Sequence, residues 1–322
     1  MLTVDFINVG YGDAILIREQ KSGYSMLVDC GDVTTGTTES TSGRIAAADF
    51  LLQEQIKKLD LLVVTHLHRD HTGGLLDVLQ NVQVAECWTN FLPCAERWDA
   101  RPVIEKDYSP GAICLVESLE IYLKALKIML EHQHTLVRKI DAAQENVMLA
   151  PGLKADVYVE GKQLFDQQDE ICERILSGAA DGKALDALDA FVNNASIRIR
   201  LEYSGASVEL PGDTCAYCWK KHRLKKCSIV KLPHHGHPDS MDEGLLSVLA
   251  PDYVVVSTSD SRTDDCPSLK VIETIRRYGL EPMFTDAVSR HGVTADRHQA
   301  VRMEIMEDGH VRAAYHSVQK IK

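Results

Sequence analysis

The most informative part of this sequence is Val63-Val64-Thr65-His66-Leu67-His68-Arg69-Asp70-His71-Thr72-Gly73-Gly74-Leu75. Its first residues are β-branched and apolar, and together with Leu61 and Leu62 they predict a buried strand. The residues from Leu75 onward predict a helix. Three histidines and one aspartate stand between the two elements, so they belong to a loop at the carboxyl end of a strand. Open α/β sheets place their sites at such loops.

The polar residues of this loop suit a metal ion. Neutral imidazole and carboxylate are ligands for zinc, manganese and iron. His66 and His68 alternate with Leu67, so both imidazoles can point toward one ion. Asp70 and His71 follow the turn and can reach a second ion. The sequence therefore predicts one or two divalent metal ions, with zinc as the favoured ion and manganese as the alternative.

A hydrolytic metal pair also needs a bridging carboxylate and further imidazoles, and the second half of the chain offers both. Asp213 follows a predicted strand over 206–210, where its carboxylate is free to point at the metals. His234 and His235 follow another predicted strand over 229–232. Each signal is weak by itself, but together with the first loop they form a consistent set of ligands.

The spacing His66-x-His68-x-Asp70-His71 resembles the signature of the metallo-β-lactamase superfamily. That resemblance implies an α/β fold, the αββα metallo-β-lactamase-type sandwich, with one or two metals at the edge of two packed sheets. Members hydrolyse β-lactams, thioesters and phosphodiesters, so the signature indicates the fold more strongly than the substrate. We expect one such domain over 1–322, with a helical insertion at about 95–192.

Further motifs resemble the soluble hydrolase domain of ComEC-type DNA-uptake proteins. In chain order they are Gly10-Tyr11-Gly12-Asp13-Ala14, Val28-Asp29-Cys30-Gly31, the central signature, Asn193-Asn194-Ala195-Ser196, Leu210-Pro211-Gly212-Asp213 and Pro233-His234-His235-Gly236. They cover both ends of the chain but not the insertion. The resemblance implies a metal-dependent nuclease with two metals. It assigns one metal to His66, His68 and one of His234 and His235, the other to Asp70 and His71, and Asp213 to both.

The sequence departs from that family at two motifs. Tyr11 stands where the family usually has Gln, and Cys266-Pro267-Ser268 stands where it usually has His-Pro-Ser. A thiolate can bind zinc, so Cys266 is either a ligand or an inert thiol that leaves the second metal weakly held or absent. His237, His291 and His298 could take its place as ligands.

The predicted reaction is hydrolysis of a phosphodiester in DNA or RNA by a metal-activated water. Asp70, Asp213 and His235 are the predicted catalytic residues, and nucleic acid is the predicted substrate. One alternative is a hydrolase of another ester, such as a small phosphoester, a thioester or a lactam. Another is a metal-binding protein that a partner regulates and that has weak or no activity of its own.

Two further segments allow both a structural and a functional interpretation. Apolar residues from Leu119 to Ile140 recur every three or four positions, which predicts one long amphipathic helix. Its apolar side is either internal core, part of a lid, or a surface for a protein partner. The basic run 220–226 is either a solvated helix face or a phosphate-binding site. In the second case Lys220, Lys221 and Arg223 would contact the substrate.

Composition limits the class of protein. The formal net charge of −12 opposes non-specific attraction to nucleic acid, although bound dications and a local basic patch act at short range. No apolar run approaches the length of about 18 residues that a membrane span needs, so we expect no membrane contact. The nine cysteines are scattered, and Met1 leads into a predicted strand rather than a signal peptide. We therefore expect reduced thiols and a cytoplasmic protein.

Overall fold

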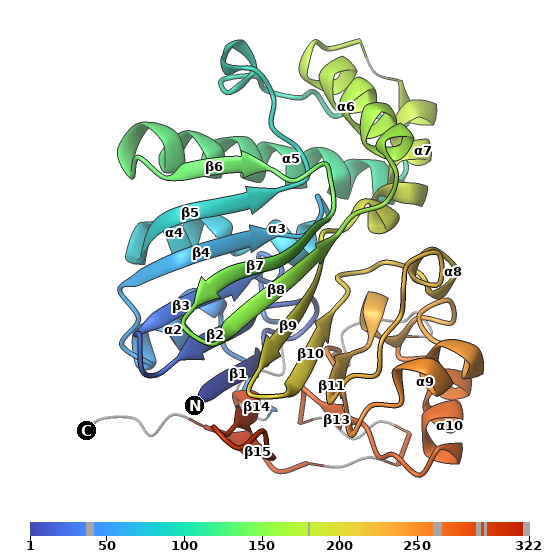
Figure 1. Ribbon diagram of the computed structural model, residues 1–322. Helices are drawn as coiled ribbons and strands as arrows, with labels where there is room; N and C mark the ends of the chain where they lie inside the picture. Colours follow the sequence, from blue (N-terminus) through green and yellow to red (C-terminus); the bar gives the residue numbers. More distant parts are fainter. Residues whose placement is uncertain (37–41, 180, 260–265, 288–290, 293–294, 318–322) are drawn as a thin grey trace.

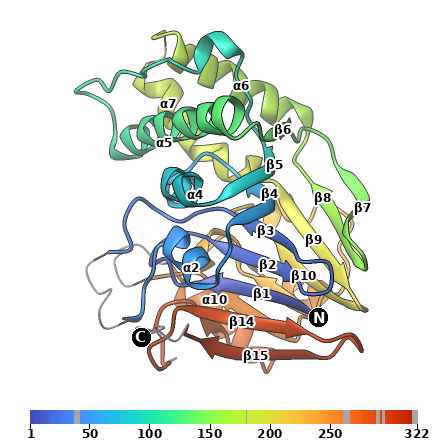
Figure 2. The same cartoon turned by 90° about the vertical axis from the view of Figure 1, so that its left-hand side faces the viewer.

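The computed structural model describes residues 1–36, 42–179, 181–259, 266–287, 291–292 and 295–317. Two mixed sheets pack face to face, and helices cover the outer face of each sheet (Figures 1 and 2). This is the expected αββα arrangement. Among the residues just given, no helix is both long and apolar enough to cross a membrane.

The first sheet has eight strands in the order β15-β14-β1-β2-β3-β4-β5-β6. Antiparallel pairing joins β15 through β3, and parallel pairing joins β3 through β6. The strands are β1 Leu2–Ile7, β2 Ile15–Glu19, β3 Tyr24–Val28, β4 Lys58–Val64, β5 Gln83–Thr89, β6 Leu136–Lys139, β14 Ala300–Ile305 and β15 Val311–His316.

The second sheet has seven strands in the order β13-β12-β11-β10-β9-β8-β7. Its hairpin half, β7 to β10, is antiparallel, and its other half, β10 to β13, is parallel. The strands are β7 Gln144–Ala150, β8 Leu153–Tyr158, β9 Arg198–Tyr203, β10 Ala206–Leu210, β11 Ile229–Lys231, β12 Tyr253–Val256 and β13 Met283–Phe284.

Strand β4 shows why its sequence is a continuous apolar run. Leu61 and Val63 face the core between the two sheets, whereas Leu62 and Val64 face the core under the helices of the first sheet. Because successive side chains point to opposite faces, a strand that is covered on both faces needs apolar residues at every position. The metal-type loop therefore leaves a strand that is held rigidly from both sides.

The helices form the two outer layers and a cap at one end of the first sheet. The first-sheet layer contains α2 (Ala47–Gln53), α4 (Leu75–Asn81) and α5 (Pro110–Lys127), and α6 (Lys162–Leu176) and α7 (Gly182–Val192) pack beside α5 (Figure 1). The second-sheet layer contains α8 (Ala216–Trp219), α9 (Glu243–Leu249) and α10 (Leu269–Arg277).

The prediction of one long helix over 119–140 is wrong in its second half. Helix α5 ends at Lys127 and passes into a single π-helical turn, Ile128–His132, after which β6 begins at Leu136. Thr135 ends the turn by donating from its hydroxyl to the carbonyl of Val84 on β5. Pairing with β5 thus overrides an apolar pattern that is compatible with a helix.

The segment at about 95–192 is helical only in part, which corrects the expectation of a helical insertion. Strand β6 extends the first sheet, and β7 and β8 extend the second, so the segment contributes to both layers. Strand β15, at the edge of the first sheet, was also not expected from the sequence. Its alternation of small, charged and aromatic residues gives no clear apolar face.

Candidate metal centre

The ligand-type residues meet where several strands of the two sheets end. The loop after β4 leads through His66 and His68 into the short helix α3 (Arg69–Thr72). Asp213 follows β10, and a 3₁₀ turn, Pro233–Gly236, follows β11. Loops that are far apart in the sequence are therefore brought to one edge of the sandwich.

Gly12 allows the β1–β2 turn to approach this edge. Its φ is +109°, and a Cβ atom there would lie 2.0 Å from the carbonyl oxygen of Asp70. Asp13 N donates to the same carbonyl at 3.2 Å. Only glycine fits so close to another backbone, and this contact places Asp13 beneath the ligand loop.

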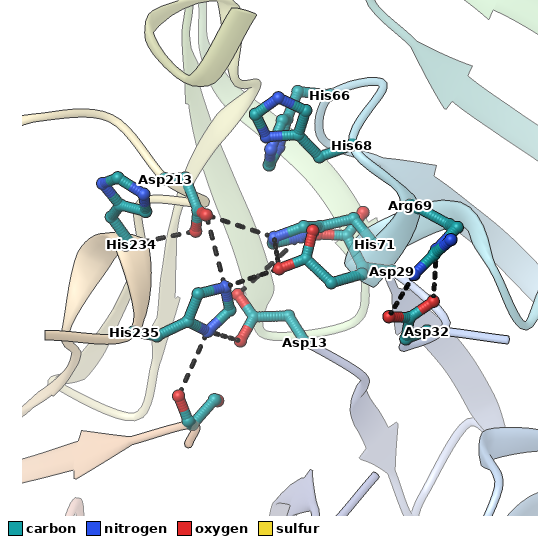
Figure 3. Close-up of polar contacts among 12 residues, drawn as sticks. Asp13, Asp29, Asp32, His66, His68, Arg69, His71, Asp213, His234 and His235 are labelled. Atoms are coloured by element: carbon teal, nitrogen blue, oxygen red, sulfur yellow. Dashed lines mark hydrogen bonds and ion pairs between the residues drawn. The ribbon is translucent and has the colours of Figure 1, made fainter. Parts of the chain in front are cut away.

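Four buried side chains form what we call the central cluster: Asp70, His71, Asp213 and His235. Each offers a ligand atom within 4.8 Å of the others. Asp213 Oδ2 lies 3.3 Å from Nε2 of both His71 and His235, and Asp70 Oδ2 lies 3.1 Å from His235 Nε2. Figure 3 shows both imidazoles pointing toward Asp213.

Hydrogen bonds on the far side of each ring orient the two imidazoles. His71 Nδ1 lies 2.8 Å from Asp29 Oδ2, and His235 Nδ1 lies 3.1 Å from the carbonyl of Ser257. Because both acceptors take a proton from Nδ1, each neutral ring presents the Nε2 lone pair to the cluster. Metal-binding histidines are held in the same way in other proteins.

His66 adds a fifth ligand-type side chain beside the cluster. Its Nδ1 lies 3.1 Å from Thr65 Oγ1 and 3.2 Å from Ser196 Oγ, and its ring centroid is 4.1 Å from that of His71. His66 Nε2 is buried and has no hydrogen-bond partner among the described residues. A buried nitrogen without a partner is costly, so this atom fits a metal ligand.

Sequence comparison identifies the family of the part that carries the ligand loop. Residues 7–97 match the family described as "Metallo-beta-lactamase superfamily", and this range includes His66, Asp70 and His71. The chain carries a metallo-β-lactamase superfamily domain. The match and the αββα layers agree with the resemblance expected from the His66–His71 signature.

A curated protein is similar to most of this chain. ComE operon protein 3 of Bacillus subtilis (strain 168) is 23% identical over 299 residues, which make up 88% of this chain and 32% of that protein. The chain thus spans about a third of the curated relative it matches. This similarity confirms the resemblance to ComEC-type proteins.

Two solved structures are also similar. The metallo-beta-lactamase fold protein YhfI from Bacillus subtilis has 10% sequence identity and a TM-score of 0.48, covering 97% of this chain and 99% of that one. CmlA, a diiron β-hydroxylase from Streptomyces venezuelae, has 14% identity and a TM-score of 0.47, covering 89% of this chain and 54% of that one.

Two of the expected ligands of the metallo-β-lactamase domain lie outside the central cluster. His68 Nε2 is 3.2 Å from Asp189 Oδ1 on α7, a contact that the sequence did not suggest. His234 Nδ1 is 3.2 Å from Asp239 Oδ1, although its backbone N–H donates to Asp213 Oδ1 at 3.1 Å. Of the adjacent pair, the structure therefore brings His235 rather than His234 into the cluster.

Cys266 also lies outside the cluster. Its buried Sγ is 4.0 Å from the carbonyl oxygen of His234, and Ser268 N donates to the carbonyl of Gly236 at 2.8 Å. Residues 266–268 thus pack behind the turn that carries His234 and His235. The three histidines that could have replaced Cys266 face away from the cluster as well: His291 Nε2 contacts the carbonyl of Pro267, His298 Nε2 contacts that of Phe284, and His237 faces Asp239.

Lys231 and Asp13 lie buried beside the central cluster. No sequence pattern indicated that these two residues pair with each other or approach Asp213. The fully buried Lys231 ammonium pairs with Asp13 and lies 3.5 Å from Asp213 Oδ1. Burial lowers the pKa of Lys231, but Asp13 and Asp213 offset that effect and raise the pKa above its ordinary value. The lysine therefore remains charged and holds Asp213 so that Oδ2 faces the imidazoles.

The protonation of the cluster follows from its carboxylates. Burial lowers the pKa of His235, but Asp213 and Asp70 outweigh it and raise the pKa to about 9. The pKa of His71 is raised well above its ordinary value, because Asp213, Asp29 and Asp70 also outweigh burial. Without a metal, protons on these rings balance the buried negative charge. Burial together with the charge of His71 lowers the pKa of His66 well below its ordinary value, so His66 stays neutral.

A cleft of about 780 Å³ opens above the central cluster. Its lining includes Asp70 and Asp213 from the cluster, Asp32 and His68 near the ligand loop, and Asp189 from α7. The only cationic Lys or Arg among the described lining residues is Arg69, which pairs with Asp32 and Glu117. The cleft is therefore strongly acidic in the absence of metal.

The basic run 220–226 lies outside the residues that line the cleft, and acidic side chains pair with much of it. Lys220 pairs with Asp242, and Lys221 lies 2.8 Å from Glu160. Arg223 is exposed. The role of Lys220, Lys221 and Arg223 in substrate binding remains a prediction.

Proposed function

We propose that this chain is a metal-dependent hydrolase that cleaves phosphodiesters in nucleic acid. The observation that carries the proposal is the central cluster, in which the Nε2 atoms of His71 and His235 meet the Oδ2 atoms of Asp70 and Asp213 beneath an open cleft. Imidazole nitrogens and carboxylate oxygens in one buried group are the donor set of hydrolytic zinc and manganese sites.

The buried charges support occupancy by a dication. Asp13, Asp29, Asp70 and Asp213 are buried, and Lys231 is the only fully buried lysine among the described residues. Buried carboxylates are costly unless cations balance them. The unpartnered Nε2 of His66 is a further donor that a metal would satisfy. The residues present therefore fit one or two divalent ions.

In the proposed site, Asp70, His71, Asp213 and His235 would hold the metal, and His66 would add a nitrogen. When bound, a dication lowers the pKa of a coordinated water and polarises the phosphoryl group. Asp29 keeps His71 in the tautomer with its lone pair on Nε2. Lys231 is completely buried, so it positions Asp213 and does not donate a proton to a leaving group. His68, which lines the cleft, is the candidate for that donor.

The nucleic-acid substrate is inferred from the ComEC-type motifs, which run from Gly10 to Gly236 in the order of that family. A second candidate is a hydrolase for a small ester, and the charge of the cleft favours it. The described lining residues include five aspartates, namely Asp32, Asp70, Asp189, Asp213 and Asp239, and the one Lys or Arg among them, Arg69, is already paired. Such an acidic cleft does not attract a nucleic acid, which is a polyanion, unless bound metals supply positive charge.

A cleavage screen tests the proposal. The chain is freed of metal with a chelator, reloaded with zinc or manganese, and assayed on single-stranded DNA, duplex DNA, RNA, a chromogenic phosphodiester, a thioester and a lactam. We expect metal-dependent turnover of the phosphodiesters and its loss in Asp213→Asn. Turnover of only a thioester or a lactam would establish the second candidate. Metal uptake without turnover on any substrate would favour a partner-regulated metal-binding protein.

A further inference from the structure

A second group of ligand-type side chains lies beside the cleft, and we call it the wall cluster: His234, His237 and Asp239. Two of them, His234 and Asp239, line the cleft. Each of the three offers one ligand atom within 4.8 Å of the others. Asp239 Oδ1 lies 3.2 Å from His234 Nδ1 and 2.8 Å from His237 Nδ1, and the two imidazole rings stack with centroids 4.4 Å apart. None of its members belongs to the central cluster.

One ion can reach all three ligand atoms, because each lies within 4.8 Å of the others. Two ligands at about 2.1 Å from zinc in tetrahedral geometry stand about 3.4 Å apart. The turn that carries them is fixed by its own backbone, because His237 N donates to the carbonyl of His234 at 2.8 Å. Its far end is tied to α8, because Ala216 N donates to the carbonyl of Asp239 at 2.9 Å.

Asn193 provides an independent observation. Its Nδ2 lies 3.3 Å from His234 Nε2, while its Oδ1 is buried and has no hydrogen-bond partner among the described residues. A buried amide oxygen without a partner costs free energy. After a half-turn of the amide, Oδ1 accepts a hydrogen bond from His234 Nε2–H and Nδ2 takes the buried position.

That arrangement decides which nitrogen of His234 is free. With the hydrogen on Nε2, the neutral ring has its lone pair on Nδ1, which faces the Asp239 carboxylate at 3.2 Å. The lone pair and the carboxylate repel each other unless a positive charge lies between them. Metal-binding histidines commonly donate a hydrogen bond to a protein oxygen from the ring nitrogen that does not bind the metal.

We propose that His234, His237 and Asp239 bind a divalent ion of the zinc class through Nδ1, Nδ1 and Oδ1, with Asn193 orienting His234. Three protein ligands leave a coordination position open. The ion adds positive charge to a cleft that is otherwise acidic, so the open position suits an anionic oxygen of a bound ligand. This inference holds whichever bond the central cluster hydrolyses.

Titration with Co²⁺, a spectroscopic substitute for zinc, tests the wall cluster. The metal-free full chain is compared with His237→Ala, Asp239→Asn and a matched control, His222→Ala, whose imidazole pairs with Glu160. We expect the first two variants to bind about one Co²⁺ fewer per chain and to lose tetrahedral Co²⁺ absorption, with the control unchanged. Asn193→Ala should weaken the same site by about tenfold.

The same titration in Asp213→Asn separates this inference from the proposed function. That substitution weakens the central cluster, and the Co²⁺ that His237→Ala removes should still bind. If the wild-type chain, His237→Ala and Asp239→Asn bind equal amounts of Co²⁺, the inference is overturned, and protons alone join Asp239 to the two imidazoles. Thermal melts of all variants verify that each is folded.

Discussion

Asp29 Oδ2 lies 2.8 Å from Nδ1 of His71, a residue 42 positions further along the chain, and both side chains are fully buried. Asp29 also accepts hydrogen bonds from the backbone N–H and the hydroxyl of Thr65, at 2.8 and 2.6 Å. One carboxylate thus joins the start of the ligand loop to an imidazole of the central cluster. Such carboxylates fix the ring and increase its basicity toward a metal.

We therefore expect Asp29→Asn to weaken metal binding by about 10- to 100-fold while the protein remains folded. The amide can retain one contact with Thr65 but cannot supply the negative charge that orients His71. Competition with a chelator measures the affinity. Asp32→Asn is the matched control, because Asp32 follows the same strand but pairs with Arg69. Equal losses in both variants would contradict a specific role for Asp29.

The protonation of His235 in the central cluster predicts how the free energy of unfolding depends on pH. In the metal-free protein the pKa of His235 is raised from 6.5 to about 9, because Asp213 and Asp70 outweigh the opposing effect of burial. A raised pKa stabilises the fold fully below about pH 6.5, and the stabilisation is lost as pH rises through about 9. The shift corresponds to a contribution on the order of 3 kcal/mol.

Thermal unfolding of chelator-treated protein between pH 6 and pH 10 tests this expectation. The melting temperature should fall across that range, and zinc should restore it at the alkaline end, since a metal binds the deprotonated imidazoles. His235→Asn should flatten the metal-free profile. A melting temperature that rises with pH in the wild-type protein would show that the cluster is not stabilised by protons.

Lys231 is expected to be essential for stability. Lys231→Met removes the cation that lies between Asp13 and Asp213 and leaves their carboxylates uncompensated. Breaking a buried ion pair costs about 3–5 kcal/mol, and urea unfolding measures it. Lys162→Met is the control, because this lysine is 82% exposed and forms only a surface pair. That control should change stability by no more than about 0.5 kcal/mol.

Cys266→Ser should leave the metal content unchanged. The thiol lies behind the turn with Sγ 4.0 Å from the carbonyl of His234, and it is not among the ligand atoms of the central cluster. Elemental analysis of the reloaded protein provides the measurement. The loss of one metal per chain in this variant would instead restore the thiolate-ligand interpretation of the sequence.

The basic run can be tested one residue at a time. If it contacts a phosphate backbone, Arg223→Glu should weaken nucleic-acid binding. The slope of the logarithm of the binding constant against the logarithm of the salt concentration should then decrease in magnitude by about one. Lys221→Glu should have a smaller effect, because Glu160 already pairs with this lysine. Cleavage of a small chromogenic phosphodiester should be spared in both. An unchanged salt slope in Arg223→Glu would exclude a phosphate contact at this position.

Much of the fold could be predicted because its signals are local. The apolar run before His66 is continuous because β4 is covered on both faces, and the ligand loop follows it directly. The segment after Leu119 was harder to predict, because an apolar pattern that suits a helix also occurs where the chain turns into β6. Only the pairing with β5 decides between the two, and that contact is far away in sequence.

The sequence by itself determined the metallo-β-lactamase-type sandwich and the loops that carry ligand-type residues, since strand periodicity and motif order are properties of the chain. The tertiary structure decided which side chains meet. His234 and His235 are adjacent and both have left-handed φ values, yet one faces Asp239 and the other the central cluster. Lys231 and Asp13 are 218 positions apart and share a buried ion pair. Such choices depend on how distant loops pack against one another, and local patterns carry no information about that packing.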